Sequence, residues 1–174
     1  GLENSLLNIP LSQEVRNSRT NNVPFISLEN YCDLLGWFLS EGSLQRKESV
    51  SIAQSKSIGV SKIIVLLDKI GYKYSYVGHQ FQIYSKQLVL LFDKLGNCRE
   101  KFIPREVLGL SEKYLRILFS SLMSGDGHWS SEDSGHYYTL SKQLKDDFQE
   151  LAIKLGYVTR VSSRLRFGRQ WKSY

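Results

Sequence analysis

Two stretches of this chain, 85 positions apart, follow the same plan. Residues 34–42 read LLGWFLSEG and residues 119–127 read FSSLMSGDG, so each is an apolar run with small residues that ends in an acid and a glycine. The same offset places Ile70-Gly71-Tyr72 on Leu155-Gly156-Tyr157. An accidental match of two amphipathic helices would not continue so far downstream. The sequence therefore predicts a duplicated half-domain.

The two halves share a predicted order of elements. Ser27 and Ser111 are candidate N-caps of apolar helices that run to about Ser40 and Gly125, where Gly42 and Gly127 suit the helix ends. Further helices end at Ile70-Gly71 and Leu155-Gly156, and the β-prone stretches are 49–54, 72–77, 81–84, 135–140 and 157–167. The prediction is an α+β fold of two pseudosymmetric αββαββα halves packed through the paired motif helices.

The predicted domain boundaries follow from this order. They are a lead-in arm at 1–26, a first half at 27–95, a linker at 96–110 and a second half at 111–174. A helix at about 86–95 closes the first half, and its equivalent in the second half is missing. We therefore expect the apolar face behind Val161, Leu165 and Phe167 to be covered by the arm, by a neighbouring molecule or by a longer parent protein.

Small residues four positions apart mark one face of each motif helix. They are Gly36 and Ser40 in the first helix and Ser121 and Gly125 in the second. This spacing lets two helix backbones approach closely. If the helices pack in parallel, Glu41 and Asp126 emerge together at the same end.

That placement is unfavourable for stability. A carboxylate at a helix C-terminus faces the negative end of the helix dipole, and two carboxylates repel each other. Separate solvated acids are the structural alternative, but the matched positions favour a function. Paired hard oxygens beside the backbone carbonyls of Ser40 and Gly125 suit Mg²⁺, or another divalent cation such as Mn²⁺ or Ca²⁺. Two such ions can stabilise the attacking and leaving oxygens of phosphodiester hydrolysis.

The two nonamers resemble the paired motifs of LAGLIDADG homing endonucleases, in the single-chain form that carries both copies. The resemblance covers roughly residues 27–174. Phe102-Ile103-Pro104, leading into 115–127, is more similar to the endonuclease domains embedded in inteins than to intron-encoded enzymes. It implies that Glu41 and Asp126 bind the metal and that saddle-shaped sheets from both halves lie over a long site on double-stranded DNA. The first acid is Glu, which makes the site asymmetric.

The resemblance also implies polar or basic residues near the metal. Gln54, at the end of a strand, and Lys86, at the start of the next helix, lie where such catalytic residues are expected. Gln54 shares strand parity with Val50 and Ile52, so it could equally point into the core. In the second half the 85 offset leads to Thr139 and Trp171, with Lys142 and Lys172 close by.

A basic strand face suggests contact with DNA independently of the resemblance. Arg160, Arg164 and Arg166 alternate with apolar residues in the segment that ends the chain. Such arginines can neutralise phosphates or pair with guanine, although an ordinary solvated strand is the alternative. The full set of DNA-binding candidates is Arg46, Lys47, Lys56, Lys73, Arg160, Arg164, Arg166, Arg169 and Lys172.

Composition is consistent with this interpretation. The chain has 174 residues and a formal net charge of +6, which favours a polyanionic partner. The two cysteines cannot form a disulfide framework or a four-thiolate zinc site, and they favour an intracellular location over secretion. No apolar run is long enough to span a membrane.

The sequence thus predicts a monomeric, Mg²⁺-dependent, site-specific endonuclease. The alternatives are a catalytically inactive nucleic-acid-binding relative, such as a maturase or regulator, and a helical adaptor in which the repeat serves packing only.

Overall fold

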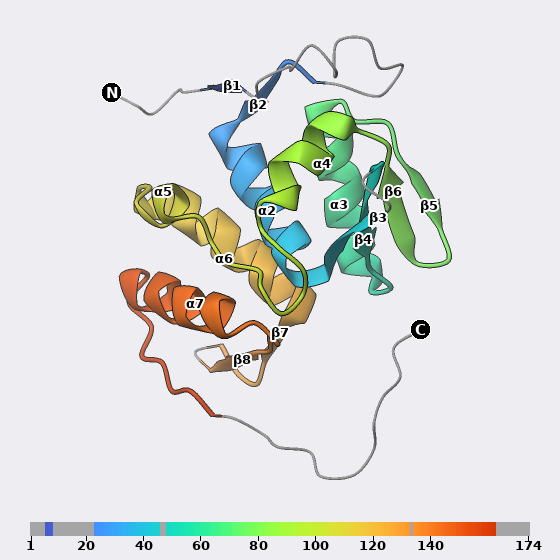
Figure 1. Cartoon of the computed structure of the whole chain (residues 1–174). Helices are drawn as coiled ribbons and strands as arrows, with labels where there is room; N and C mark the ends of the chain where they lie inside the picture. The colour runs from blue at the N-terminus through green and yellow to red at the C-terminus, as the bar shows by residue number, and fades with distance from the viewer. Residues whose placement is uncertain (1–5, 9–22, 46–47, 133, 163–174) are drawn as a thin grey trace.

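The first half contains the full predicted order of elements (Figure 1). The structure is a computed structural model that describes residues 6–8, 23–45, 48–132 and 134–162. The elements of this half are α2 (Leu28–Glu41), β3 (Gly42–Gln45), β4 (Ser49–Ala53), α3 (Ser57–Ile70), β5 (Ser75–Val77), β6 (Gln80–Ile83) and α4 (Lys86–Asp93). This is the predicted αββαββα unit.

The described part of the second half is shorter. It consists of α6 (Glu112–Asp126), β7 (Gly127–Trp129), β8 (Gly135–Tyr137) and α7 (Lys142–Lys154), and the short helix α5 (Arg105–Leu108) precedes it. The arm contributes β1 (Leu6–Asn8), which pairs antiparallel with β2 (Phe25–Ser27) ahead of α2. These two strands and the β7–β8 hairpin lie at opposite ends of the molecule (Figure 1).

Local sequence explains where the motif helices begin and end. The Ser27 hydroxyl accepts a hydrogen bond from the Asn30 amide, whereas Ser111 occupies the N-cap position of α6 without a side-chain bond. Gly42 and Gly127 follow the helices, but with extended φ angles of −86° and −94°. At each of these glycines the chain passes directly from a helix into a strand, and the motif acid just before it is the last residue of the helix. Helix α3, by contrast, ends at a glycine in the left-handed conformation, Gly71, whose φ is +93°.

The two motif helices touch through their small residues. A Cβ atom on Gly36 would lie 2.6 Å from the Cβ of Ser121, and one on Gly125 would lie 2.5 Å from the Cβ of Ser40. Positions related by the 85 offset therefore face each other, as parallel packing about a pseudo-twofold axis requires. Ser40 Oγ also donates to the Leu122 carbonyl at 3.2 Å across this contact.

The four-stranded sheet of the first half has the order β3-β4-β6-β5, with every neighbouring pair antiparallel. The row Gly42–Ile52–Phe81–Tyr76 places the fully buried Ile52 and Phe81 on the core face. On the opposite face the pairs join hydroxyl and amide side chains, in the row Ser43–Ser51–Gln82–Ser75, where Ser43 and Ser75 are exposed and Ser51 is buried. This outer face carries no Lys, Arg, Asp or Glu among the described strand residues.

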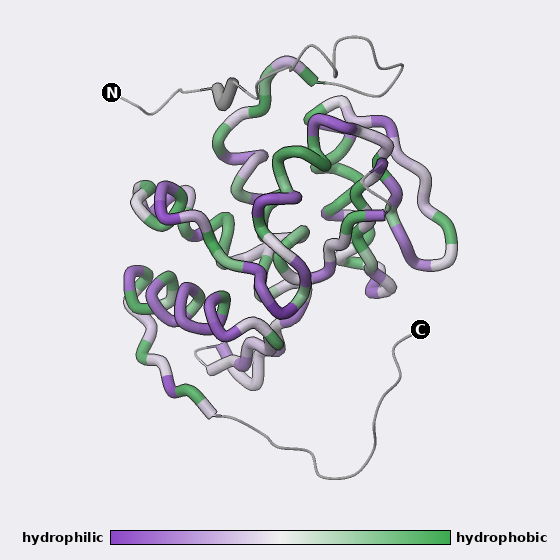
Figure 2. The backbone as a smooth tube through the Cα atoms, viewed as in Figure 1, coloured by the Kyte–Doolittle hydropathy of each residue, from purple (hydrophilic) through white to green (hydrophobic). Residues whose placement is uncertain are grey.

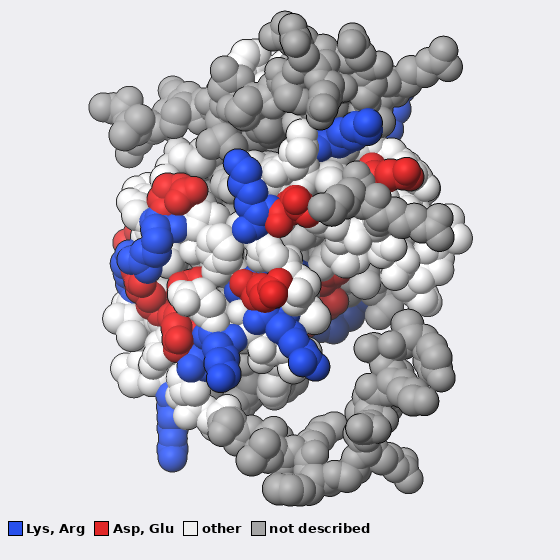
Figure 3. All heavy atoms as spheres, in the orientation of Figure 1, with Lys and Arg blue, Asp and Glu red and all other residues white. Residues whose placement is uncertain are grey.

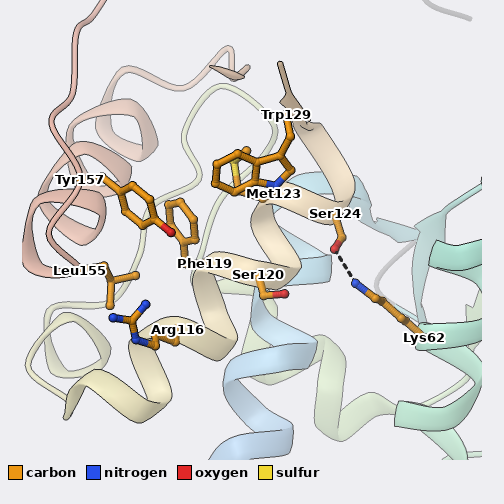
Figure 4. Close-up of a pocket in the computed structure, with 9 residues that line it drawn as sticks. All are labelled: Lys62, Arg116, Phe119, Ser120, Met123, Ser124, Trp129, Leu155 and Tyr157. Atoms are coloured by element: carbon orange, nitrogen blue, oxygen red, sulfur yellow. Dashed lines mark hydrogen bonds between the residues drawn. The ribbon is translucent and has the colours of Figure 1, made fainter. Parts of the chain in front are cut away.

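Among the described residues, a cavity in the second half lies beside the position equivalent to the one that α4 covers in the first half. Phe38 stacks on Phe92 of α4 with ring centroids 4.2 Å apart. At the 85 offset from Phe38, Met123 lines a cavity of about 390 Å³ instead. Figure 4 shows Phe119, Trp129 and Tyr157 around this cavity, with a hydrogen bond from Lys62 to Ser124 on its far side.

The strand predicted at 157–167 does not form in its described part. Residues 157–162 have no regular secondary structure, and 163–167 lie outside the described residues. Val158 is fully exposed and Val161 is half-exposed. No described strand pairs with residues 157–162, so their alternating pattern does not become part of a sheet.

Segment 96–110 is more than a connector. Lys101, Ile103, Val107 and Leu108 in it are buried, and the segment passes alongside α7 (Figure 1). Figure 2 shows the contrast between the largely apolar α2 and the mostly polar α7. Within the described ranges, no helix has the length and apolar character to cross a bilayer.

The close helix contact gives a stability prediction. Gly36→Ala places a methyl group 2.6 Å from Ser121 and 3.0 Å from the Leu118 carbonyl, so we expect a loss of about 1–3 kcal/mol in the free energy of unfolding by urea. Gly109→Ala is the matched control, because its added Cβ would have no described neighbour closer than 3.6 Å. Equal effects of the two substitutions would contradict the packing described here.

Candidate functional site: a carboxylate pair with two amines

Glu41 and Asp126 end the two packed helices on the same side of the contact. Both are half-buried. A Cβ on Gly125, the residue before Asp126, would lie 3.2 Å from Glu41 Cγ. The helix contact thus brings the two carboxylates to a common site, and Ser40 and Gly125 lie directly beneath them.

The environment of the pair disfavours its ionisation. Burial raises the pKa of Asp126 to about 6, and the negative charge of Glu41 adds to this shift. Burial likewise raises the pKa of Glu41. Lys56 and Lys101 oppose both shifts. Two half-buried acids with raised pKa values are a candidate functional site, because a divalent cation would relieve the cost that folding imposes on them.

Lys101 is the main residue that the sequence analysis missed. It is only 4% exposed, and its Nζ donates to the carbonyls of Phe38 at 2.6 Å, Leu39 at 3.0 Å and Gly42 at 2.8 Å. Its ammonium therefore sits at the negative end of α2. Burial lowers the pKa of Lys101 to about 8, while Asp126 and Glu41 oppose the shift. The available signal was a lysine directly before the apolar Phe102-Ile103-Pro104.

Lys56, predicted as a DNA contact, lies near enough to Glu41 and Asp126 for its charge to act on both. It is exposed at the N-cap position of α3. An exposed amine beside a pair of carboxylates can reach a phosphate group that approaches them.

Gln54 takes the packing orientation that its strand parity allowed. It is buried, its Oε1 accepts from the Lys56 amide at 2.9 Å, and its Cδ faces Gly59 of α3. Its Nε2 has no hydrogen-bond partner among the described residues. Gln54 follows β4, whose Ile52 pairs with Gly42, so its backbone lies at the acid end of the sheet.

The structure does not bring Lys86 to the acids. It begins α4, and the neighbouring Gln87 exchanges two hydrogen bonds with the backbone of Val23, near the start of α2. The two acids lie at the opposite end of α2, which has 14 residues and is therefore about 20 Å long. The reason is the direction of α4, which begins near the start of α2 and runs toward its end, so that Phe92 rather than Lys86 reaches Phe38.

The remaining basic candidates divide into two groups. Lys73 and Arg160 are exposed and lie outside regular elements. The others lie outside the described residues: Arg46, Lys47, Arg164, Arg166, Arg169 and Lys172. On the face in Figure 3, Lys and Arg side chains are interspersed with Asp and Glu side chains. Arg105 and Lys154 each form an ion pair with Glu150.

The donor set fits a hard divalent cation. Within the described ranges, no group of three or more His, Cys, Asp and Glu side chains gathers to hold a metal. Two carboxylates with nearby backbone carbonyls suit Mg²⁺, which binds few protein ligands and keeps several waters. They do not suit Zn²⁺, which favours closed nitrogen and sulfur sites.

Comparison with solved structures shows the fold. The chain is similar to I-DmoI in complex with DNA and Ca, with 14% identity, a TM-score of 0.53 and coverage of 74% of this chain and 73% of the other. It is equally similar to an I-DmoI variant bound to nicked target DNA in the presence of Mn, with 16% identity, a TM-score of 0.53 and coverage of 74% and 78%. The chain therefore has the LAGLIDADG homing endonuclease fold, as predicted.

Comparison of sequences is less informative. No protein-family model matches the chain. A curated relative from Chlamydomonas moewusii, an ATP-dependent Clp protease proteolytic subunit, is 26% identical over 119 residues. The match covers 67% of this chain but only 12% of that relative, so it does not carry the relative's activity to this chain.

The raised pKa of Asp126 has a consequence for stability. Its pKa is about 6 in the folded protein against 3.8 as the ordinary value, so the folded state holds the proton more tightly and loses stability as the pH rises from about 4 to 6. Asp126→Asn should therefore stabilise the protein above pH 6 by about 1 kcal/mol, a value reduced for partial solvent exposure.

Urea unfolding at several pH values measures this effect. The gain should vanish near pH 3, where the aspartate is protonated in both states. The control is Asp146→Asn, at an exposed residue of α7. A gain that persists at low pH would contradict the assigned origin.

Proposed function

We propose that this protein is a divalent-cation-dependent endonuclease that cleaves both strands of a specific double-stranded DNA site, as a monomer. The observation that supports this most is the pair of half-buried, mutually repelling carboxylates at the junction of the two motif helices. The fold is shared with a DNA endonuclease whose structures contain target DNA with Mn or Ca. Mg²⁺ is the expected cation, because its ligand preferences match the site.

The residues at this site have distinct roles in the proposed reaction. Glu41 and Asp126 would hold the cation, with the adjoining backbone of Ser40 and Gly125. When bound, the cation supplies an activated water and stabilises charge on the phosphate oxygens. Lys101 holds the end of α2 in place and partly offsets the negative charge of the acids. Lys56, which is exposed and whose charge acts on Asp126, would attract the scissile phosphate.

The outer face of the first-half sheet is suited to reading base edges. Its exposed side chains include those of Ser43, Ser75 and Gln80, which are uncharged, whereas Ser49 and Ser51 are buried. A Gln side chain can form a bidentate contact with adenine in the major groove. Gln80 is exposed, and Gln82 is half-buried with a hydrogen bond from its Nε2 to Ser49. This face provides hydrogen bonds but no positive charge, so the phosphate contacts that give affinity would come from basic residues elsewhere in the protein.

Cleavage of a randomised plasmid library, with sequencing of the cut ends, tests the proposed activity. The parent protein should cut selected sites with Mg²⁺ or Mn²⁺ and none with EDTA. Glu41→Gln and Asp126→Asn should each abolish cleavage and leave DNA affinity intact, because removing a carboxylate charge eases the approach of phosphates.

Asp146→Asn is the matched control and should cleave normally. Selective DNA binding without any cation-dependent cleavage by the parent protein would identify it instead as an inactive nucleic-acid-binding relative. Unchanged cleavage by both acid variants would contradict the proposed site.

The proposed reading face gives a second prediction. Gln80→Ala should relax the preference for one base pair of the selected site by about 1–3 kcal/mol, measured as relative affinities for single-base variants. The salt dependence of binding should not change, because no phosphate contact is lost. A uniform loss of affinity across all sequences would show that Gln80 does not read a base.

A further inference from the structure

Helix α7 of the second half and its N-cap residue bind the backbone of Lys101 and of Ile103, two residues further on. Ser141 Oγ donates to the Lys101 carbonyl at 2.6 Å, and Asp147 Oδ2 accepts from the Ile103 amide at 2.8 Å. Ser141 is 1% exposed and Asp147 is 3% exposed. Two buried side chains of one helix thus hold the three-residue segment from which Lys101 reaches α2.

Both side chains are themselves held in place. Ser141 is the N-cap of α7, and its Oγ accepts from the Leu144 amide at 3.1 Å while it donates to Lys101. The second oxygen of Asp147, Oδ1, accepts from Gln143 Nε2 at 2.8 Å. A carboxylate that is bonded at both oxygens has little freedom to move away from the Ile103 amide.

The repeat shows that this arrangement is not a general requirement of the fold. At the 85 offset, Ser141 corresponds to Lys56 and Asp147 corresponds to Lys62. Helix α3 begins at Lys56 without a side-chain cap, and Lys62 donates to Ser124 on the other half. The first half therefore contributes its own amine to the acid pair, through Lys56, at the position where the second half has the serine that holds Lys101.

We propose that Ser141 and Asp147 are positioning residues that hold the Lys101 ammonium at the C-terminal end of α2, beside the Glu41–Asp126 pair. This positioning role does not depend on the proposed function, but its consequence for DNA cleavage rests on the proposed function. The two motif helices pack directly on each other. The hydrogen bonds of Ser141 and Asp147 to the Lys101 segment, which we call the clamp, form a second connection, from α7 to the end of α2.

The nature of the two hydrogen bonds determines the expected effect of each substitution. Asp147→Ala removes the acceptor for Ile103, whereas Asp147→Asn keeps an oxygen there, and the Gln143 amide can turn to accept from the new Nδ2. If positioning is the role, Asn should preserve the function of Asp147. If the negative charge were the role, Asn would fail as completely as Ala.

A nuclear magnetic resonance measurement on the full chain tests the clamp without DNA. The Lys101 ammonium is buried and bonded to three carbonyls, so its ¹H–¹⁵N signal should be visible through slow exchange, and Lys101→Met should identify it by its loss. We expect the signal to persist in Asp147→Asn and to disappear in Asp147→Ala and Ser141→Ala. A folded Asp147→Ala or Ser141→Ala protein that retains the signal would overturn the proposal.

Two controls separate positioning from simple destabilisation. Ser85→Ala removes another buried N-cap serine, that of α4, and Glu150→Gln alters the exposed ion pair of α7 with Arg105. Both should retain the Lys101 signal. If Asp147→Ala does not fold, the Lys101 signal in Ser141→Ala, compared with that in Ser85→Ala, still tests the proposal.

Single-turnover cleavage at saturating DNA gives the functional readout. Asp147→Ala should lower the rate constant about tenfold with little change in DNA affinity, as expected for a residue that acts through its neighbour, and Asp147→Asn should restore it. An equal rate in Asp147→Ala and the parent would refute the functional consequence. Absence of cleavage in the parent, with the signals as expected, would refute the proposed function and leave the clamp intact.

Discussion

The direct contact between α2 and α6 is the constraint on which the rest of this structure depends. Gly36 faces Ser121 and Ser40 faces Gly125, so there is no room for a larger side chain at either crossing point. Because these contacts join positions 85 apart and the helices end at Glu41 and Asp126, also 85 apart, the two acids lie at the same end of the helix pair. Efficient packing and an unfavourable pair of charges thus arise from the same geometry.

The protein offsets this cost unequally in its two halves. Lys101 enters from the segment between the halves and caps α2 through three carbonyls, and Lys56 approaches from the start of α3. No described side chain plays the part of Lys101 at the end of α6. Burial raises the pKa of Asp126 to about 6, although the charges of Lys101 and Lys56 oppose this shift. The pseudosymmetric helices therefore carry an asymmetric site, in agreement with the unlike acids Glu and Asp.

The repeat made much of the fold predictable, because spacing along a helix determines which residues share a face. Gly36, Ser40 and their equivalents could be assigned to the contact without any knowledge of the rest of the chain. Residues that depend on the path of the chain could not be assigned. Lys101 is buried in a segment that contacts Ser141 and Asp147, far away in the sequence. Lys86 lies far from the acids because α4 begins near the start of α2 rather than near its end. The alternation in 157–162 predicted a strand, but a strand also needs a partner.

The central claim is that Glu41 and Asp126 form one cation site at the end of the helix pair. The most direct measurement is a crystal structure of the protein soaked in Mn²⁺, with the ion located by its anomalous scattering. The account predicts a peak within about 2.2 Å of a carboxylate oxygen of each acid, and no peak there in Glu41→Gln or Asp126→Asn crystals. Carboxylates more than about 10 Å apart, too far to share even two ions and their waters, or a peak unaffected by either substitution, would contradict it.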